Sequence, residues 1–137
     1  MIRGGAWDTR PSGTIGLAAR EHVVAERLWK SSGLGPKDMS LAMLYDAFTP
    51  EVFTQTEGYG FCKPGEAKDF FRGGEARITG STPINTNGGL IGEAYIHGMN
   101  QITEAVRQIR GTAANQVANV GHVLVSSGAS AHILGQP

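Results

Sequence analysis

The chain has 137 residues, the length of one domain, and its 12 basic and 12 acidic side chains leave no net charge to attract nucleic acid or an anionic membrane surface. No apolar run approaches the roughly 18 residues of a membrane-spanning helix, so we expect no membrane span and no nucleic-acid partner. The single cysteine, Cys62, excludes an internal disulfide framework and favours a reducing, cytoplasmic location.

The first half of the chain predicts alternating strands and helices. Residues 1–6 form a short strand candidate, and apolar residues at helical spacing predict a helix over 17–32 that Gly33 can end. The continuous apolar run at 41–45 predicts a central strand that is covered on both faces. Thr-Pro-Glu then starts a helix over 49–57, and a strand followed at once by a helix is typical of α/β domains.

The second half predicts a small hairpin over 70–78, a short strand over 83–86 and a helix over 96–110. Two antiparallel strands, 120–126 and 130–134, close the chain. Within the helix, helical spacing predicts an apolar inner stripe and a polar outer face. The expected inner residues are Ile102, Ala105, Val106 and Ile109, and the expected outer residues are Gln101, Glu104, Arg107 and Gln108.

The stretch 85–100 combines several glycines and three asparagines with a tyrosine and a histidine, at the entry to the last predicted helix. Glycine lets the backbone approach a ligand closely, and a helix N-terminus offers free N–H groups to a developing oxyanion. The stretch is therefore a candidate site. A strand-to-helix turn with buried amide side chains and no ligand is the alternative that the residues leave open.

These residues resemble the thiolase superfamily. Asn-x-x-Gly-Gly at 85–89 matches a thiolase motif whose catalytic histidine lies six residues after the second glycine, which is the position of Tyr95, and Gly98 matches the glycine of the following loop. Tyr-Asp-Ala-Phe at 45–48 matches the thiolase Asn-Glu-Ala-Phe element. The resemblance covers nearly all of residues 1–137. It implies the α/β fold of the thiolase C-terminal half, with a mixed five-stranded sheet, helices on both faces and the N-terminal half absent.

Within the superfamily, residues 45–51, 60–66 and 95–100 resemble nonspecific lipid-transfer or sterol-carrier-type thiolases and thiolase-like steroid side-chain aldolases. This resemblance implies retro-aldol cleavage of a β-hydroxyacyl-CoA in lipid or steroid degradation, with coenzyme A as part of the substrate and with no separate cofactor and no metal. The implied partners are an N-terminal thiolase half or further copies of the chain, and a small OB-fold protein.

Two departures from the thiolase pattern argue against acyl transfer through a cysteine. Ser126 stands where the second thiolase cysteine is expected, and a hydroxyl is a far weaker acid than a thiol. Tyr95 replaces the catalytic histidine, and the ordinary pKa of tyrosine lies near 10 rather than 6.5. Both changes suit a reaction without a covalent intermediate.

We expect Tyr95 to be the general acid/base, Tyr45 to share its pocket from the end of the central strand, and His97 to donate to the thioester oxygen. Asp46 orients a tyrosine or a polar network, or caps the next helix. A buried tyrosine with a hydrogen-bonded hydroxyl is the competing interpretation of Tyr95, core packing that of Tyr45, and a structural role that of His97. Loop shaping is the competing interpretation of the asparagines. The expected substrate-binding positions are Asn87, Gly88, Gly89, Gly98, Asn100 and Ser126.

Two other functions stay open. An acetyl-CoA acetyltransferase fragment is the alternative enzyme, and a lipid-transfer or partner-binding module without catalysis is the alternative of another class. We expect the isolated chain to be inactive, because half of the thiolase pocket is missing from it.

Overall fold

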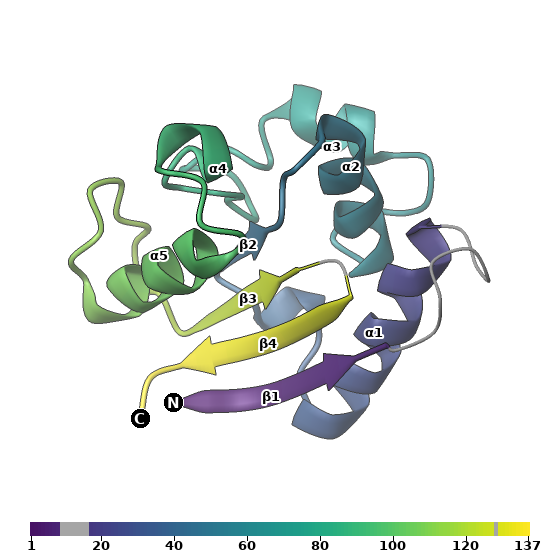
Figure 1. The fold of residues 1–137 in the computed structure, drawn as a ribbon, viewed down its shortest axis with the longest axis horizontal. Helices are drawn as coiled ribbons and strands as arrows, with labels where there is room; N and C mark the ends of the chain where they lie inside the picture. Colours follow the sequence, from purple (N-terminus) through teal and green to yellow (C-terminus); the bar gives the residue numbers. More distant parts are fainter. Residues whose placement is uncertain (9–16, 128) are drawn as a thin grey trace.

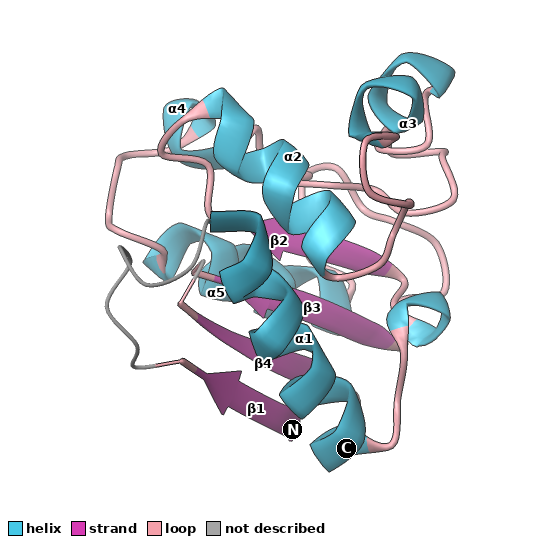
Figure 2. Cartoon of the chain, turned by 90° about the vertical axis from the view of Figure 1, so that its right-hand side faces the viewer, coloured by secondary structure: helices cyan, strands magenta, loops and turns pink. Residues whose placement is uncertain are grey.

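A computed structural model describes residues 1–8, 17–127 and 129–137. One mixed sheet carries helices on its two faces, with α1 against one face and α5 against the other (Figures 1 and 2). The elements are β1 (Ile2–Trp7), α1 (Leu17–Ser32), the 3-10 turn η1 (Pro36–Asp38), β2 (Leu41–Leu44), α2 (Thr49–Gly58), α3 (Ala67–Gly73), α4 (Gly89–Gly92), α5 (Met99–Arg110), β3 (His122–Ser126) and β4 (Ser130–Gly135).

The strand order is β1-β4-β3-β2. β2 pairs in parallel with β3, and β4 pairs antiparallel with both β3 and β1. The predicted α/β class, the mixed sheet and the placement of helices on both faces are therefore confirmed. None of the helices within the described ranges is long and apolar enough to cross a membrane.

Alternation along β2 divides the core into two layers. Leu41 and Met43 point to the α5 side, where they pack with Ala105 of that helix. Ala42 and Leu44 point to the α1 side. All four β2 residues are fully buried, as the continuous apolar run predicts. The α1-side layer is completed by Ala6, Val24, Ala25, Leu28, Met39, Tyr59, Leu124, Ala131 and Ile133.

The predicted fifth strand is wrong: the sheet has four strands, and residues 83–86 touch β2 through one isolated bridge between Ala42 and Ile84. Asn85 explains why pairing stops there. Its φ of 50° turns the backbone away from the sheet. Its side chain then takes over the pairing, because Asn85 Oδ1 accepts from the Leu44 N–H at 2.8 Å and Nδ2 donates to the Leu44 carbonyl at 2.9 Å.

The predicted hairpin at 70–78 is also wrong. Residues 67–73 form α3, which ends at Gly74 in the left-handed conformation with φ 87°. The aromatic pair that suggested a strand packs sideways: Phe70 is buried, and the Phe71 ring lies 5.1 Å from the Phe53 ring of α2. Phe71 packs on α2, and Phe70 meets the Phe71 ring edge to face at 5.6 Å, so both aromatic residues are accommodated on a helix.

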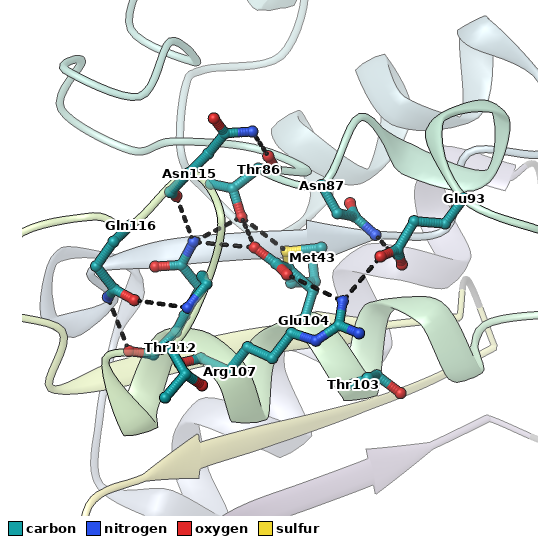
Figure 3. A network of polar contacts seen from close by, with 12 residues as sticks. Met43, Thr86, Asn87, Glu93, Thr103, Glu104, Arg107, Thr112, Asn115 and Gln116 are labelled. Atoms are coloured by element: carbon teal, nitrogen blue, oxygen red, sulfur yellow. Dashed lines mark hydrogen bonds and ion pairs between the residues drawn. The ribbon is translucent and has the colours of Figure 1, made fainter.

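The predicted faces of α5 are largely wrong, and the helix begins at Met99 rather than residue 96. Ala105 is buried as expected, but Ile102 is 38% exposed. The buried side chains are mostly polar, namely Asn100, Gln101, Glu104 and Gln108. Hydrogen bonds to the loops that flank the helix explain this reversal. Thr86 Oγ1 donates to Glu104 at 2.7 Å (Figure 3). The Gln108 side chain donates to the carbonyl of residue 115 and accepts from the N–H of residue 117.

We expect Asn85→Ala to lower the free energy of unfolding by about 2–4 kcal/mol, because it leaves two backbone groups of Leu44 without partners. Urea denaturation measures this loss. Asn119→Ala is the control, since Asn119 also has a positive φ (54°) but is exposed. Its loss should be about 1 kcal/mol, the cost of the left-handed backbone for alanine. Equal losses in the two variants would mean that the Asn85 side-chain bonds contribute nothing.

Candidate active site

Two tyrosines that lie 50 positions apart meet at the carboxyl end of β2. Tyr45 follows the last residue of that strand, and Tyr95 lies in the segment 93–98, which joins α4 to α5. Their hydroxyl oxygens are 2.9 Å apart, and their rings meet edge to face with centroids 6.5 Å apart. Ligands of α/β sheets bind at this end of the strands, so the pair occupies a position suited to a reacting group.

His97 joins the pair because of its backbone conformation. Its φ of 42° and the φ of 91° at Gly98 reverse the chain, so that the His97 ring lies edge-on to the Tyr95 ring at 5.0 Å. Gly98 immediately precedes α5, and a Cβ there would lie 3.8 Å from the Tyr45 ring. The structure thus brings Tyr45, Tyr95 and His97 together.

The cluster lies on the surface of the domain. Tyr95 is 49% exposed and His97 is exposed as well. A hollow of about 660 Å³ lies elsewhere, between α1 and residues 57–66, and neither tyrosine of the pair lines it. Five large apolar side chains that lie close to Tyr45 or Tyr95 in the sequence are also exposed, namely Phe48, Ile91, Ile96, Met99 and Ile102. We call these five residues the apolar rim.

The hydrogen bond between the hydroxyls changes the acidity of Tyr45. The bond to Tyr95 raises the pKa of Tyr45 from its ordinary value near 10 to about 12, and partial burial and the negative charges of Glu51 and Asp46 add to the effect. The Tyr45 hydroxyl is therefore protonated at neutral pH. It can donate a hydrogen bond to Tyr95 or to an oxyanion.

Asp46 makes its contacts away from the tyrosine hydroxyls. Its carboxylate accepts from the Leu90 N–H at 3.2 Å and from the Gln101 side chain at 3.2 Å. A Cβ at Gly89 would collide with this carboxylate, so only glycine fits there. Asp46 thereby attaches the glycine-rich turn, in which Gly88 also has a positive φ (86°), to the end of β2.

The two predicted asparagines are engaged with the loop itself. The Asn87 side chain accepts from the Gly89 N–H at 3.1 Å and donates to Glu93 at 3.1 Å. Asn100 is 5% exposed, and its side chain accepts from the Ile96 N–H at 3.0 Å and donates to the Ala94 carbonyl at 2.6 Å. Asn100 therefore holds the backbone on either side of Tyr95, and Asn87 holds the turn that precedes it.

Ser126 is separated from the surface cluster. Its backbone carbonyl accepts from the Tyr45 N–H at 3.0 Å, but its side chain lies in the core. The residue is 2% exposed, and its hydroxyl is hydrogen-bonded to the buried Tyr59 hydroxyl at 2.8 Å. The structure thus does not bring the Ser126 hydroxyl to the surface on which the tyrosine pair lies.

Sequence reasoning missed one ion pair beside the cluster. Arg107, which was expected to face solvent, bonds Glu93 at 2.8 Å (Figure 3). Hydrogen bonds from Asn87 and from Arg107 lower the pKa of Glu93, so it is charged at neutral pH. Neither residue stands in a motif, and no periodicity relates positions 93 and 107.

Among the described residues, no three His, Cys, Asp or Glu side chains gather as metal ligands.

Known proteins similar to this chain agree with the fold and the motifs. The family model "Thiolase C-terminal domain-like" matches residues 10–133. This chain is 57% identical to a 17-hydroxy-3-oxo-4-pregnene-20-carboxyl-CoA lyase of Mycobacterium tuberculosis over 106 residues, which are 77% of the chain. Over the same length it is 55% identical to a steroid side-chain-cleaving aldolase of Thermomonospora curvata. The matches cover 28% and 27% of these relatives, so the chain corresponds to a minor part of their length.

A solved structure agrees over almost the entire chain. The structure, named "Ltp2-ChsH2(DUF35) aldolase", superposes with a TM-score of 0.89 at 43% identity. The superposition covers 98% of this chain and 39% of the solved chain. From the family match, the sequence identity and the shared fold, we conclude that this chain belongs to the thiolase C-terminal domain-like family.

Proposed function

We propose that this chain is the C-terminal half of a thiolase-like enzyme that cleaves a carbon–carbon bond of a β-hydroxyacyl-CoA by a retro-aldol reaction, in the breakdown of a steroid side chain. The observation that carries the proposal is the pair of tyrosine hydroxyls 2.9 Å apart, where a thiolase would carry a histidine and an asparagine. The two similar proteins named as a lyase and an aldolase support the reaction type.

In this proposal Tyr95 reacts as its phenolate and takes the proton of the substrate's β-hydroxyl group. The bond between the α and β carbons then breaks, its electron pair forms an enolate on the thioester, and the β carbon leaves as a carbonyl group. The Tyr45 hydroxyl, whose pKa is raised, keeps its proton and donates to the oxygen of Tyr95, which stabilises the phenolate before the transfer. His97 donates to the thioester oxygen as negative charge develops there. The Tyr95 hydroxyl finally returns its proton to the α carbon of the enolate, which restores the phenolate.

The proposal includes no cofactor beyond the coenzyme A of the substrate, because the thioester itself stabilises the enolate. Gly88, Gly89 and Gly98 permit close approach of the substrate to the backbone. Asn87 and Asn100 act on the substrate indirectly, through the loop that they hold. The free thiol of Cys62 fits a reducing compartment, and we place the enzyme in the cytoplasm.

We propose that a second polypeptide surface completes the pocket, supplied by an N-terminal thiolase half or by another copy of the chain. Tyr95 and the apolar rim are exposed in this domain, and a contiguous set of exposed apolar groups marks an interaction site. A small OB-fold partner is part of the proposal, since the name of the similar solved structure joins Ltp2 to ChsH2(DUF35).

An acetyl-CoA acetyltransferase is the less favoured enzyme. The acyl-transfer reaction needs a thiol near the substrate, whereas Ser126 is buried and bonded to Tyr59. A binding module without catalysis leaves the hydroxyl pair without a role.

In the assembled enzyme, Tyr95→Phe should lower kcat by about 10²–10⁴-fold with the fold intact, because it removes the proton acceptor and little else. Steady-state kinetics with a β-hydroxyacyl-CoA and circular dichroism measure the two effects. Tyr45→Phe is the internal comparison. If Tyr45→Phe abolishes turnover and Tyr95→Phe does not, the two roles are exchanged. If both variants are active, the retro-aldol proposal loses its acid–base group.

The pKa of Tyr45 should fall from about 12 toward 10 in Tyr95→Phe, because the bond that raises it is removed. Ultraviolet titration at the tyrosinate absorption band measures this. Three tyrosines are present in the chain, and Tyr59 stays silent in this range because burial raises its pKa further. A Tyr45 transition that stays near 12 in the variant would show that the hydroxyls do not bond in solution.

The isolated chain should self-associate through the apolar rim. Sedimentation should show weight-average mass rising with concentration, and Met99→Asp or Ile102→Asp should suppress the rise by placing a charge on the rim. Ile78→Asp is the control, because Ile78 is 42% exposed but lies in the segment that follows α3. A clean monomer at high concentration, with no binding of an apolar dye, would contradict the expectation.

A further inference from the structure

The segment 93–98 carries Tyr95 and His97 but has no helix or strand of its own to fix it. Tyr95 is half exposed, and its side chain contacts the Tyr45 hydroxyl and the rings of Tyr45 and His97. The position of its hydroxyl must therefore be set by whatever holds the backbone before and after it.

The backbone beside Tyr95 is held by one buried side chain. Asn100 Oδ1 accepts from the N–H of residue 96, and Asn100 Nδ2 donates to the carbonyl of residue 94. These two groups belong to the residues that immediately precede and follow Tyr95. Because Asn100 is 5% exposed in the first turn of α5, the helix fixes both of them at once.

The start of the segment is held by charge. Glu93 Oε1 pairs with Arg107 Nη1 at 2.8 Å, and Glu93 Oε2 accepts from Asn87 at 3.1 Å, so both carboxylate oxygens are engaged (Figure 3). Arg107 Nη1 also lies 3.9 Å from Glu104 Oε2. Arg107 thus lies between a loop carboxylate and a helix carboxylate.

The buried carboxylate of Glu104 helps to fix the position of Arg107, and we call Arg107, Glu93 and Asn100 the anchors of the segment. It is 3% exposed, and a buried carboxylate needs hydrogen-bond donors to offset its lost hydration. Thr86 donates to it at 2.7 Å and Gln108 at 3.0 Å, which fixes the carboxylate beside Arg107. A chain of contacts therefore runs from the buried face of α5 through Arg107 to the first residue of the segment.

We infer that Asn100 and the Arg107–Glu93 ion pair are positioning residues that hold the Tyr95 hydroxyl against Tyr45. This inference rests on the proposed function, since it assigns a catalytic purpose to the geometry. A displacement of about 1 Å at a reacting group can reduce the rate by as much as 10²-fold. Loss of an anchor should therefore slow the chemical step without removing any group that touches the substrate.

The test uses Arg107→Gln, Arg107→Lys, Glu93→Gln and Asn100→Ala in the assembled enzyme. Arg107→Gln, Glu93→Gln and Asn100→Ala should lower kcat by about 10- to 100-fold with KM changed by less than about 3-fold. Arg107→Lys should recover part of the loss, because lysine keeps the charge. Arg110→Gln is the matched control and should retain turnover, because Arg110 is exposed on the same helix and makes no ion pair with another described residue.

A second readout does not depend on the reaction. If an anchor holds the tyrosines together, its loss should also lower the pKa of Tyr45 from about 12 toward 10 in the ultraviolet titration of the folded variant. A variant that merely weakens the fold would lower the unfolding midpoint and leave that pKa in place. Should Asn100→Ala fail to fold, Arg107→Gln and Glu93→Gln decide the question, because their side chains are 45% and 30% exposed.

Folded variants with unchanged kcat and an unchanged Tyr45 pKa would overturn the inference. So would a rise in KM at constant kcat, which indicates substrate binding instead. If the Tyr45 pKa falls in every anchor variant while turnover stays normal and Tyr95→Phe is also active, the proposed retro-aldol role fails and the positioning geometry stands.

Discussion

The attachment of residues 85–90 to the end of β2 determines where the tyrosines meet. The Asn85 side-chain amide bonds the backbone N–H and carbonyl of Leu44, where the backbone of a further strand would otherwise pair. The sheet therefore ends at β2, and the chain turns away after residue 85. Two residues beyond Leu44, Asp46 receives the Leu90 N–H. With both ends of this turn bonded to β2, the segment that follows α4 passes directly over Tyr45. Substitution of either side chain would release the segment from the strand.

A buried carboxylate extends this arrangement to the rest of the domain. Glu104 has donors from Thr86, in the turn, and from Gln108, which in turn binds the loop at residues 115–117. The cost of burying the carboxylate is thereby offset by donors from the turn and from α5. Such a network specifies one arrangement of these parts, since any shift leaves a charged oxygen without a donor. The loops around α5 are ordered by this requirement more than by apolar packing.

Helices and strands could be predicted from the sequence where local patterns determine them. The prediction failed where a contact with a distant part of the chain determines the structure. The apolar run of β2 and the helix ending at Gly33 follow from composition and spacing. Helical periodicity places apolar residues inward, so it could not show that Glu104 and Gln108 are buried by loops far along the chain. The motif count located Tyr95, but the approach of His97 depends on a φ of 42° that no pattern encodes. The Glu93–Arg107 ion pair could not be predicted either, because no motif or periodicity in the sequence relates these two positions.

Under the proposed function, the exposure of the tyrosine pair is a physical argument for a second surface. Water competes for both hydroxyls, so at the surface their mutual hydrogen bond stabilises a phenolate little more than solvent does. Removal of water by an apolar surface placed on the rim would strengthen that bond and the donor bond from His97 together. The anchors Asn100 and Arg107 lie on the α5 side of the segment, so such a surface could cover the tyrosines without displacing them. The domain would then contribute positioned hydroxyls, and the covering chain would contribute the low polarity in which they act.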